Sequence, residues 1–123
     1  MKHARTVFGL LAAVFVAGAL FHAAALVVPS LAGNSPPWRH ATFVAVNLAA
    51  AAGMVRRPPL FVPLFGLLCS QQLASHGDAA YRAWRAAHRI DVASLAVLVV
   101  MPLAFALLVR DRISRAPSSR RSA

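Results

Sequence analysis

Long apolar runs separated by short polar segments make up most of this chain. The first run, residues 7–28, reads VFGLLAAVFVAGALFHAAALVV, with His22 as its one polar interruption. A helix of this length, at ~1.5 Å per residue, crosses the ~30 Å hydrocarbon core of a bilayer. Pro29 and the turn-rich string that follows it predict the end of the helix. The small residue Gly18, on the same face as His22, would let a neighbouring helix come close.

Three further apolar runs follow. The second is short and rich in alanine, and Arg-Arg-Pro-Pro stops it; the third turns polar after Cys69; the fourth contains Pro102. The period of the apolar positions indicates helices, and no stretch alternates as a strand does. We therefore predict an all-α fold, an integral membrane four-helix bundle that forms one membrane domain over residues 1–110. Its spans are expected at about 7–28, 40–55, 60–76 and 90–109.

The segment between the third and fourth runs is amphipathic. At 100° per residue, Tyr81, Trp84 and His88 fall on one face, and the arginines fall on another. Tryptophan and tyrosine favour the headgroup level, and arginine reaches toward phosphates. The pattern predicts a short interfacial helix over about 78–89, before the last span. The basic, serine-rich tail, residues 111–123, is predicted to be disordered.

Composition and charge support a lipid-facing protein. Hydrophobic residues make up 59% of the chain and charged residues only 13%, whereas soluble domains carry about 25% charged residues. The net charge is +10, and such a basic balance often indicates nucleic-acid binding. Here the cations flank the apolar runs, so we exclude nucleic acid and expect the lipid bilayer as the partner. The single cysteine, Cys69, rules out an internal disulfide.

The loop charges predict an orientation. With the N-terminus inside, nine Lys and Arg residues lie on the cytoplasmic side and four on the other side. This bias predicts a multi-pass protein of a bacterial-type inner (plasma) membrane, with both termini cytoplasmic. An alternative is that Lys2, Arg5 and the first apolar run form a signal peptide cleaved near residues 23–25, which would leave three spans.

This topology gathers the polar residues of the spans in the outer half of the membrane. Polar groups are costly in lipid, so they are expected to face the interior of the bundle or a watery pocket. We predict an outer polar pocket lined by all four spans. Its candidate ligand-binding residues are His22, His40, Asn47, Gln71, Gln72, His76, His88 and Asp91.

Three interpretations of this cluster stay open. In the first, the polar groups only hold helices together, and the chain is an accessory or interaction protein with a membrane-protein partner. In the second, histidines and Asp91 bind a metal or haem; no ligand set has metal-site spacing, bis-histidine haem would need two facing histidines, and no metal is assigned. In the third, the pocket binds a lipid headgroup or small polar ligand, with Asp91 and His76, or else His88, as an acid–base pair. The chain has none of the nucleotide-binding, serine-hydrolase or zinc-protease motifs, so whether it is an enzyme stays open.

Overall fold

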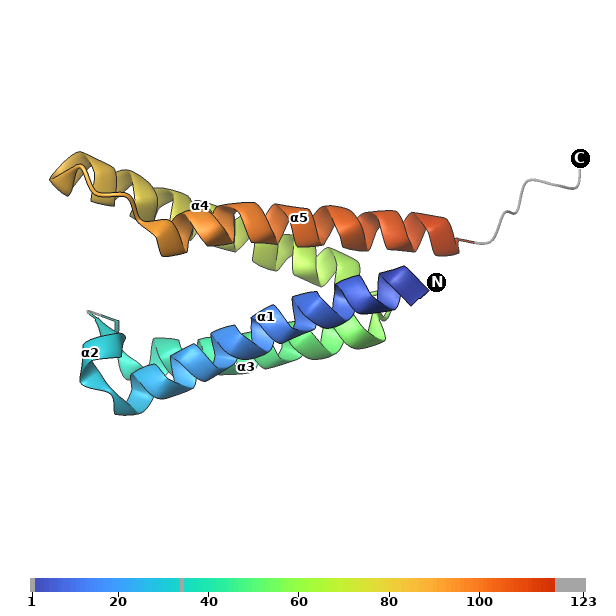
Figure 1. The fold of residues 1–123 in the computed structure, drawn as a ribbon, viewed down its shortest axis with the longest axis horizontal. Helices are drawn as coiled ribbons and strands as arrows, with labels where there is room; N and C mark the ends of the chain where they lie inside the picture. The colour runs from blue at the N-terminus through green and yellow to red at the C-terminus, as the bar shows by residue number, and fades with distance from the viewer. Residues whose placement is uncertain (1, 34, 117–123) are drawn as a thin grey trace, which may run out of the picture. The chain divides into compact units, whose positions relative to one another are not determined.

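The structure is a computed structural model, and it describes residues 2–33 and 35–116. These residues form five helices and contain no strand, which confirms the all-α prediction (Figure 1). They form two compact units, one on each side of the boundary between Arg57 and Pro58.

The first unit is a helical hairpin. α1 (Lys2–Val27) and α3 (Pro37–Arg56) run antiparallel side by side, and the four-residue α2 (Pro29–Ala32) lies in the turn between them (Figure 1). α1 ends just before Pro29, as expected. α3 begins three residues before the predicted start, because proline is favoured in the first turn of a helix. It ends at Arg56 and is capped by Arg57, which adopts the left-handed conformation and donates its N–H to the Gly53 carbonyl at 2.8 Å.

The buried positions of α1 follow the spacing of a helix-pairing stripe. They recur at intervals of three and four residues, which keeps one face toward the partner helix. The apolar members are Phe8, Ala12, Phe15, Ala19 and Ala25. His22 falls in the same stripe, and it is half-buried. The hairpin therefore directs a histidine into its own helix-helix contact.

The second unit is also a hairpin, formed by α4 (Phe61–Ala87) and α5 (Val92–Arg115) (Figure 1). Phe65, Cys69 and Gln72 are buried on α4, and Met101 and Leu108 are buried on α5. Gly66 permits this packing, because a Cβ there would lie 3.0 Å from the Phe105 ring.

The predicted interfacial helix is not a separate element. α4 continues without a break from the third apolar run through Trp84 to Ala87. Residues 70–87 contain no proline, and the single Gly77 costs a helix only about 1 kcal/mol. The break falls later, where His88 adopts the left-handed conformation and its N–H bonds to the Trp84 carbonyl at 2.9 Å.

The prediction of a disordered tail over residues 111–123 is contradicted for its first five residues. α5 continues to Arg115, so residues 111–115 are helical and the prediction was wrong there. The segment carries its own helical support, because Arg115 pairs with Asp111 at 2.9 Å, one turn apart. Residues 117–123 lie outside the described part of the chain.

Two of the five helices are long and apolar enough to cross a membrane, judged by length and composition. They are residues His3–Val27 of α1 and Val92–Arg115 of α5. Only 22% of the most apolar window of each is buried, unlike the core helix of a soluble protein. The four-span bundle remains a prediction.

Candidate functional site

The polar residues expected in one outer pocket form two groups, one in each hairpin. In the first unit, the imidazoles of His22 on α1 and His40 on α3 meet with their Nδ1 atoms 3.0 Å apart. The other nitrogen of His40, Nε2, lies 3.2 Å from the Ala32 carbonyl oxygen at the end of α2. The histidine pair thus connects all three helices of the unit.

Hydrogen bonding assigns the protons of this pair. A carbonyl oxygen only accepts, so His40 Nε2 must carry a hydrogen and donate it to Ala32. In neutral His40 the Nδ1 atom then holds a lone pair, and it accepts from His22 Nδ1–H. Both rings are therefore locked in one tautomer while they remain neutral.

Aromatic packing holds the rings in place. The His22 ring stacks on Phe43 with centroids 5.2 Å apart and an interplanar angle of 22°. Phe21 meets it edge-on at 5.5 Å. His40 is only 5% exposed. A half-buried ring fixed by stacking has little freedom to turn toward an external ligand.

Asn47 lies on the same face of α3, two turns beyond His40. Its Nδ2 donates to the Phe43 carbonyl at 2.7 Å. Its Oδ1 faces the backbone of α1, since a Cβ at Gly18 would lie 3.0 Å from it. α1 and α3 therefore come close together where Gly18 faces Asn47, as the small residue Gly18 predicts.

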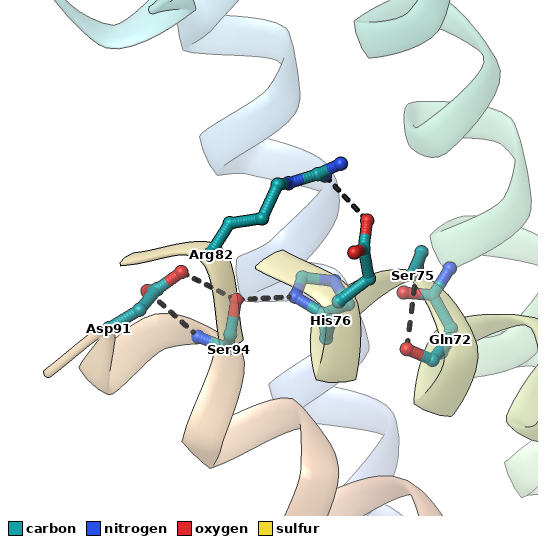
Figure 2. Close-up of polar contacts among 7 residues, drawn as sticks. Gln72, Ser75, His76, Arg82, Asp91 and Ser94 are labelled. Atoms are coloured by element: carbon teal, nitrogen blue, oxygen red, sulfur yellow. Dashed lines mark hydrogen bonds and ion pairs between the residues drawn. The ribbon is translucent and has the colours of Figure 1, made fainter. Parts of the chain in front are cut away.

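The second group links α4 to α5 through Ser94 (Figure 2). The Ser94 hydroxyl donates to Asp91 Oδ2 at 2.7 Å, and His76 Nδ1 lies 3.0 Å from the same hydroxyl oxygen. Ser94 has one hydroxyl hydrogen, and it is used in the hydrogen bond to Asp91. In the contact between His76 and Ser94, His76 Nδ1 must therefore be the donor. The expected pair of Asp91 and His76 is thus joined through a serine that is only 3% exposed.

Asp91 is also the N-cap of α5 and precedes its first residue. Its Oδ1 accepts the Ser94 backbone N–H at 3.1 Å. The side-chain and backbone hydrogen bonds from Ser94 lower the pKa of Asp91 from its ordinary value. Burial opposes this shift in part, and the nearby His76 and Arg89 lower the pKa by smaller amounts. Asp91 therefore stays ionised, as a capping carboxylate and not as a proton donor.

The remaining candidates bond locally on α4. The buried Gln72 donates from Nε2 to Gln71 Oε1 at 2.8 Å. Its backbone carbonyl accepts from Ser75 at 3.3 Å (Figure 2). His88 is exposed, and its ring packs edge-on against Trp84 with centroids 5.4 Å apart.

The arrangement favours structural hydrogen bonding over metal or haem binding. Within residues 2–33 and 35–116, no three His, Cys, Asp or Glu side chains come together as a metal site. His22 and His40 are the facing pair that bis-histidine haem would need, but 3.0 Å between their nitrogens accommodates a hydrogen and not an iron. In the second group, the Ser94 hydroxyl donates its hydrogen bond to Asp91 and not to His76. His76 is therefore not placed to act as a base that activates Ser94 as a nucleophile.

Sequence reasoning named most of these residues but not their partners. Ser94 is not among the candidate residues; the spacing Asp91-x-x-Ser94 is that of an N-cap and the residue it caps, and this could have revealed the link. The Ala32 carbonyl has no signal in the sequence, because any residue could supply it. The single pocket lined by all four spans remains a prediction.

Comparison with protein-family models, with curated proteins and with solved structures found no match to this chain.

Proposed function

We propose that this chain is a four-span inner-membrane protein with cytoplasmic termini that acts as an accessory protein and binds a partner within the bilayer. One observation carries the proposal. The polar side chains that face across each hairpin bond to its other helix, His22 to His40 and His76 to Ser94, which is how structural polar groups behave in membrane bundles.

The hairpin geometry supports four crossings. If α1 and α5 cross the bilayer, their antiparallel partners α3 and α4 lie at the same depth. α3 has 20 residues, enough for ~30 Å at ~1.5 Å per residue. Removal of α1 as a signal peptide would uncover the buried face of α3, so we propose that α1 is retained.

The topology is tested by cysteine labelling in intact cells. In a Cys69→Ala background, Arg57→Cys and Ala79→Cys should react from opposite sides of the membrane, with position 79 accessible from outside. In the topology proposed from the loop charges, Arg57 precedes the third span on the cytoplasmic side and Ala79 follows it on the outer side. Labelling of both positions from the same side would contradict the four-span arrangement.

The accessory role is tested by photo-crosslinking from the exposed helix faces. Leu20 on α1 and Leu67 on α4 are 66% and 71% exposed, and a photoreactive amino acid at each should give a discrete protein adduct in membranes. Ala104, fully buried in its own hairpin, is the control position and should give none. Lipid adducts alone at both exposed positions would contradict a protein partner.

A second candidate rests on the oriented imidazole of His76. The chain from Asp91 through Ser94 fixes His76 Nδ1 as a donor, and a histidine held in this way can serve as a base through Nε2. In this alternative the second hairpin binds, or acts on, a lipid headgroup or small polar ligand. His76→Gln would then abolish ligand binding while the helical content stays unchanged, whereas the accessory role predicts a loss of stability alone.

A further inference from the structure

The geometry of His22 and His40 points to a function that interhelical packing does not require. We propose that the pair is a proton-binding site: the two imidazoles share one added proton, and a second proton breaks the link between α1 and α3 beside α2. The proposal concerns the first hairpin alone and does not depend on the accessory role.

The first argument is the head-on approach of the rings. The centroids are 5.3 Å apart and the Nδ1 atoms 3.0 Å apart. The centroid separation exceeds the Nδ1–Nδ1 separation by the sum of the two centroid-to-nitrogen distances within the imidazole rings. The two centroids and the two Nδ1 atoms therefore lie nearly on one line, with the Nδ1 atoms facing each other. A linear N–H···N arrangement at this separation is a good hydrogen bond.

The second argument is the count of hydrogens. With both rings neutral, His22 Nδ1–H donates to His40 Nδ1, and His40 Nε2–H donates to Ala32. One added proton binds the remaining lone pair, on His22 Nε2. A single hydrogen then still lies between the two Nδ1 atoms, the pair shares the positive charge, and the bond becomes charge-assisted, which is the stronger kind. A second added proton puts two N–H groups head to head, and the bond is lost.

The third argument is the electrostatic setting. Residues 1–57 contain no Asp or Glu, so within this unit no carboxylate offsets a second positive charge. Arg39 precedes His40 and is exposed, and α2 contains no charged residue. The other basic side chains described in the unit belong to the opposite end of the hairpin: His3, Arg5, Arg56 and Arg57.

A metal ion fits this pair less well than a proton. A metal bound on the line between the two nitrogens needs ~2 Å to each, or about 4 Å between them. The observed 3.0 Å is a hydrogen-bond distance. The rings would have to separate, against the stacking of His22 on Phe43 and the anchoring of His40 to Ala32.

The experiment is nitrogen NMR of the full-length protein, labelled with ¹⁵N-histidine, in phospholipid bicelles. A shared hydrogen gives a measurable ¹⁵N–¹⁵N coupling between the two Nδ1 resonances. We expect this coupling in the wild type and in the control His3→Gln, and its complete loss in His22→Gln and in His40→Gln. As the pH falls through the imidazole range, the coupling should persist through uptake of the first proton and vanish with the second.

Three results would overturn the proposal. The first is absence of the coupling in the folded wild type. The second is that each ring takes up its proton in the wild type at the same pH as it does when the other histidine is replaced. The third is stoichiometric displacement of the shared hydrogen by added Zn²⁺ or Cu⁺, which would make the pair a metal site. Because the wild type supplies the decisive signal, a variant that fails to fold does not obscure the result.

Discussion

Replacing Gly18 with leucine will weaken the pairing of α1 with α3 and lower the free energy of unfolding by about 1–3 kcal/mol, the usual cost of overpacking. A Cβ at this position would lie 3.0 Å from Asn47 Oδ1 and 3.3 Å from Asn47 Cγ. Asn47 has little room to yield, because its Nδ2 is bonded to the Phe43 carbonyl. The larger leucine side chain would therefore push the two backbones apart.

Gly9 provides the matched control on the same helix. A Cβ there would meet nothing within 4 Å, so Gly9→Leu should leave stability unchanged or raise it slightly through helix propensity, by less than about 1 kcal/mol. Unfolding in mixed micelles, followed by the fluorescence of Trp38 in a Trp84→Phe background, reports on the first hairpin alone. Equal stability of the two leucine variants would show that the Gly18–Asn47 approach does not hold the hairpin.

Periodicity predicted the helices well because each apolar run carries its own signal. The 7–28 run corresponds to α1, and the Arg-Arg-Pro-Pro stop corresponds to the end of α3 at Arg56. Prediction failed where the end of a helix depends on weak local preferences. The change in polarity after Cys69 predicted a separate interfacial helix, but nothing between Ser70 and Ala87 forbids a helix, and α4 continues through this segment.

The partners of the polar residues could not be predicted in the same way. The contact of His22 with His40 depends on how α2 and the following turn bring two helices into register, and that is a property of the folded hairpin. The bridging role of Ser94 depends equally on the rotation of α5 against α4. Residue types and depth indicated which side chains needed partners in the membrane, and only the three-dimensional arrangement identified them.

Replacing Asp91 with alanine should destabilise the second hairpin by about 1.5–5 kcal/mol, the combined scale of a lost N-cap and a buried hydroxyl left without its acceptor. Asp91 accepts both the backbone N–H and the hydroxyl of Ser94, and the hydroxyl is itself the acceptor for His76. Asp91→Asn keeps an acceptor without the charge and should cost less. Asp78→Ala is the control, because it removes only the exposed ion pair with Arg82, worth about 0.3–0.5 kcal/mol.

The contribution of Asp91 should also depend on pH in a definite direction. Because its pKa is lowered in the folded protein, the carboxylate stabilises the hairpin above the unfolded value near ~3.9 and loses this effect as the pH falls through the folded pKa. The difference in unfolding free energy between the wild type and Asp91→Asn should therefore shrink in acid, measured by circular dichroism in mixed micelles. A difference that stays constant with pH would mean that the charge of Asp91 does not contribute to stability. If Asp91→Ala still gave the photo-crosslinked adduct despite its lower stability, the cluster would act in the fold and the partner would bind elsewhere.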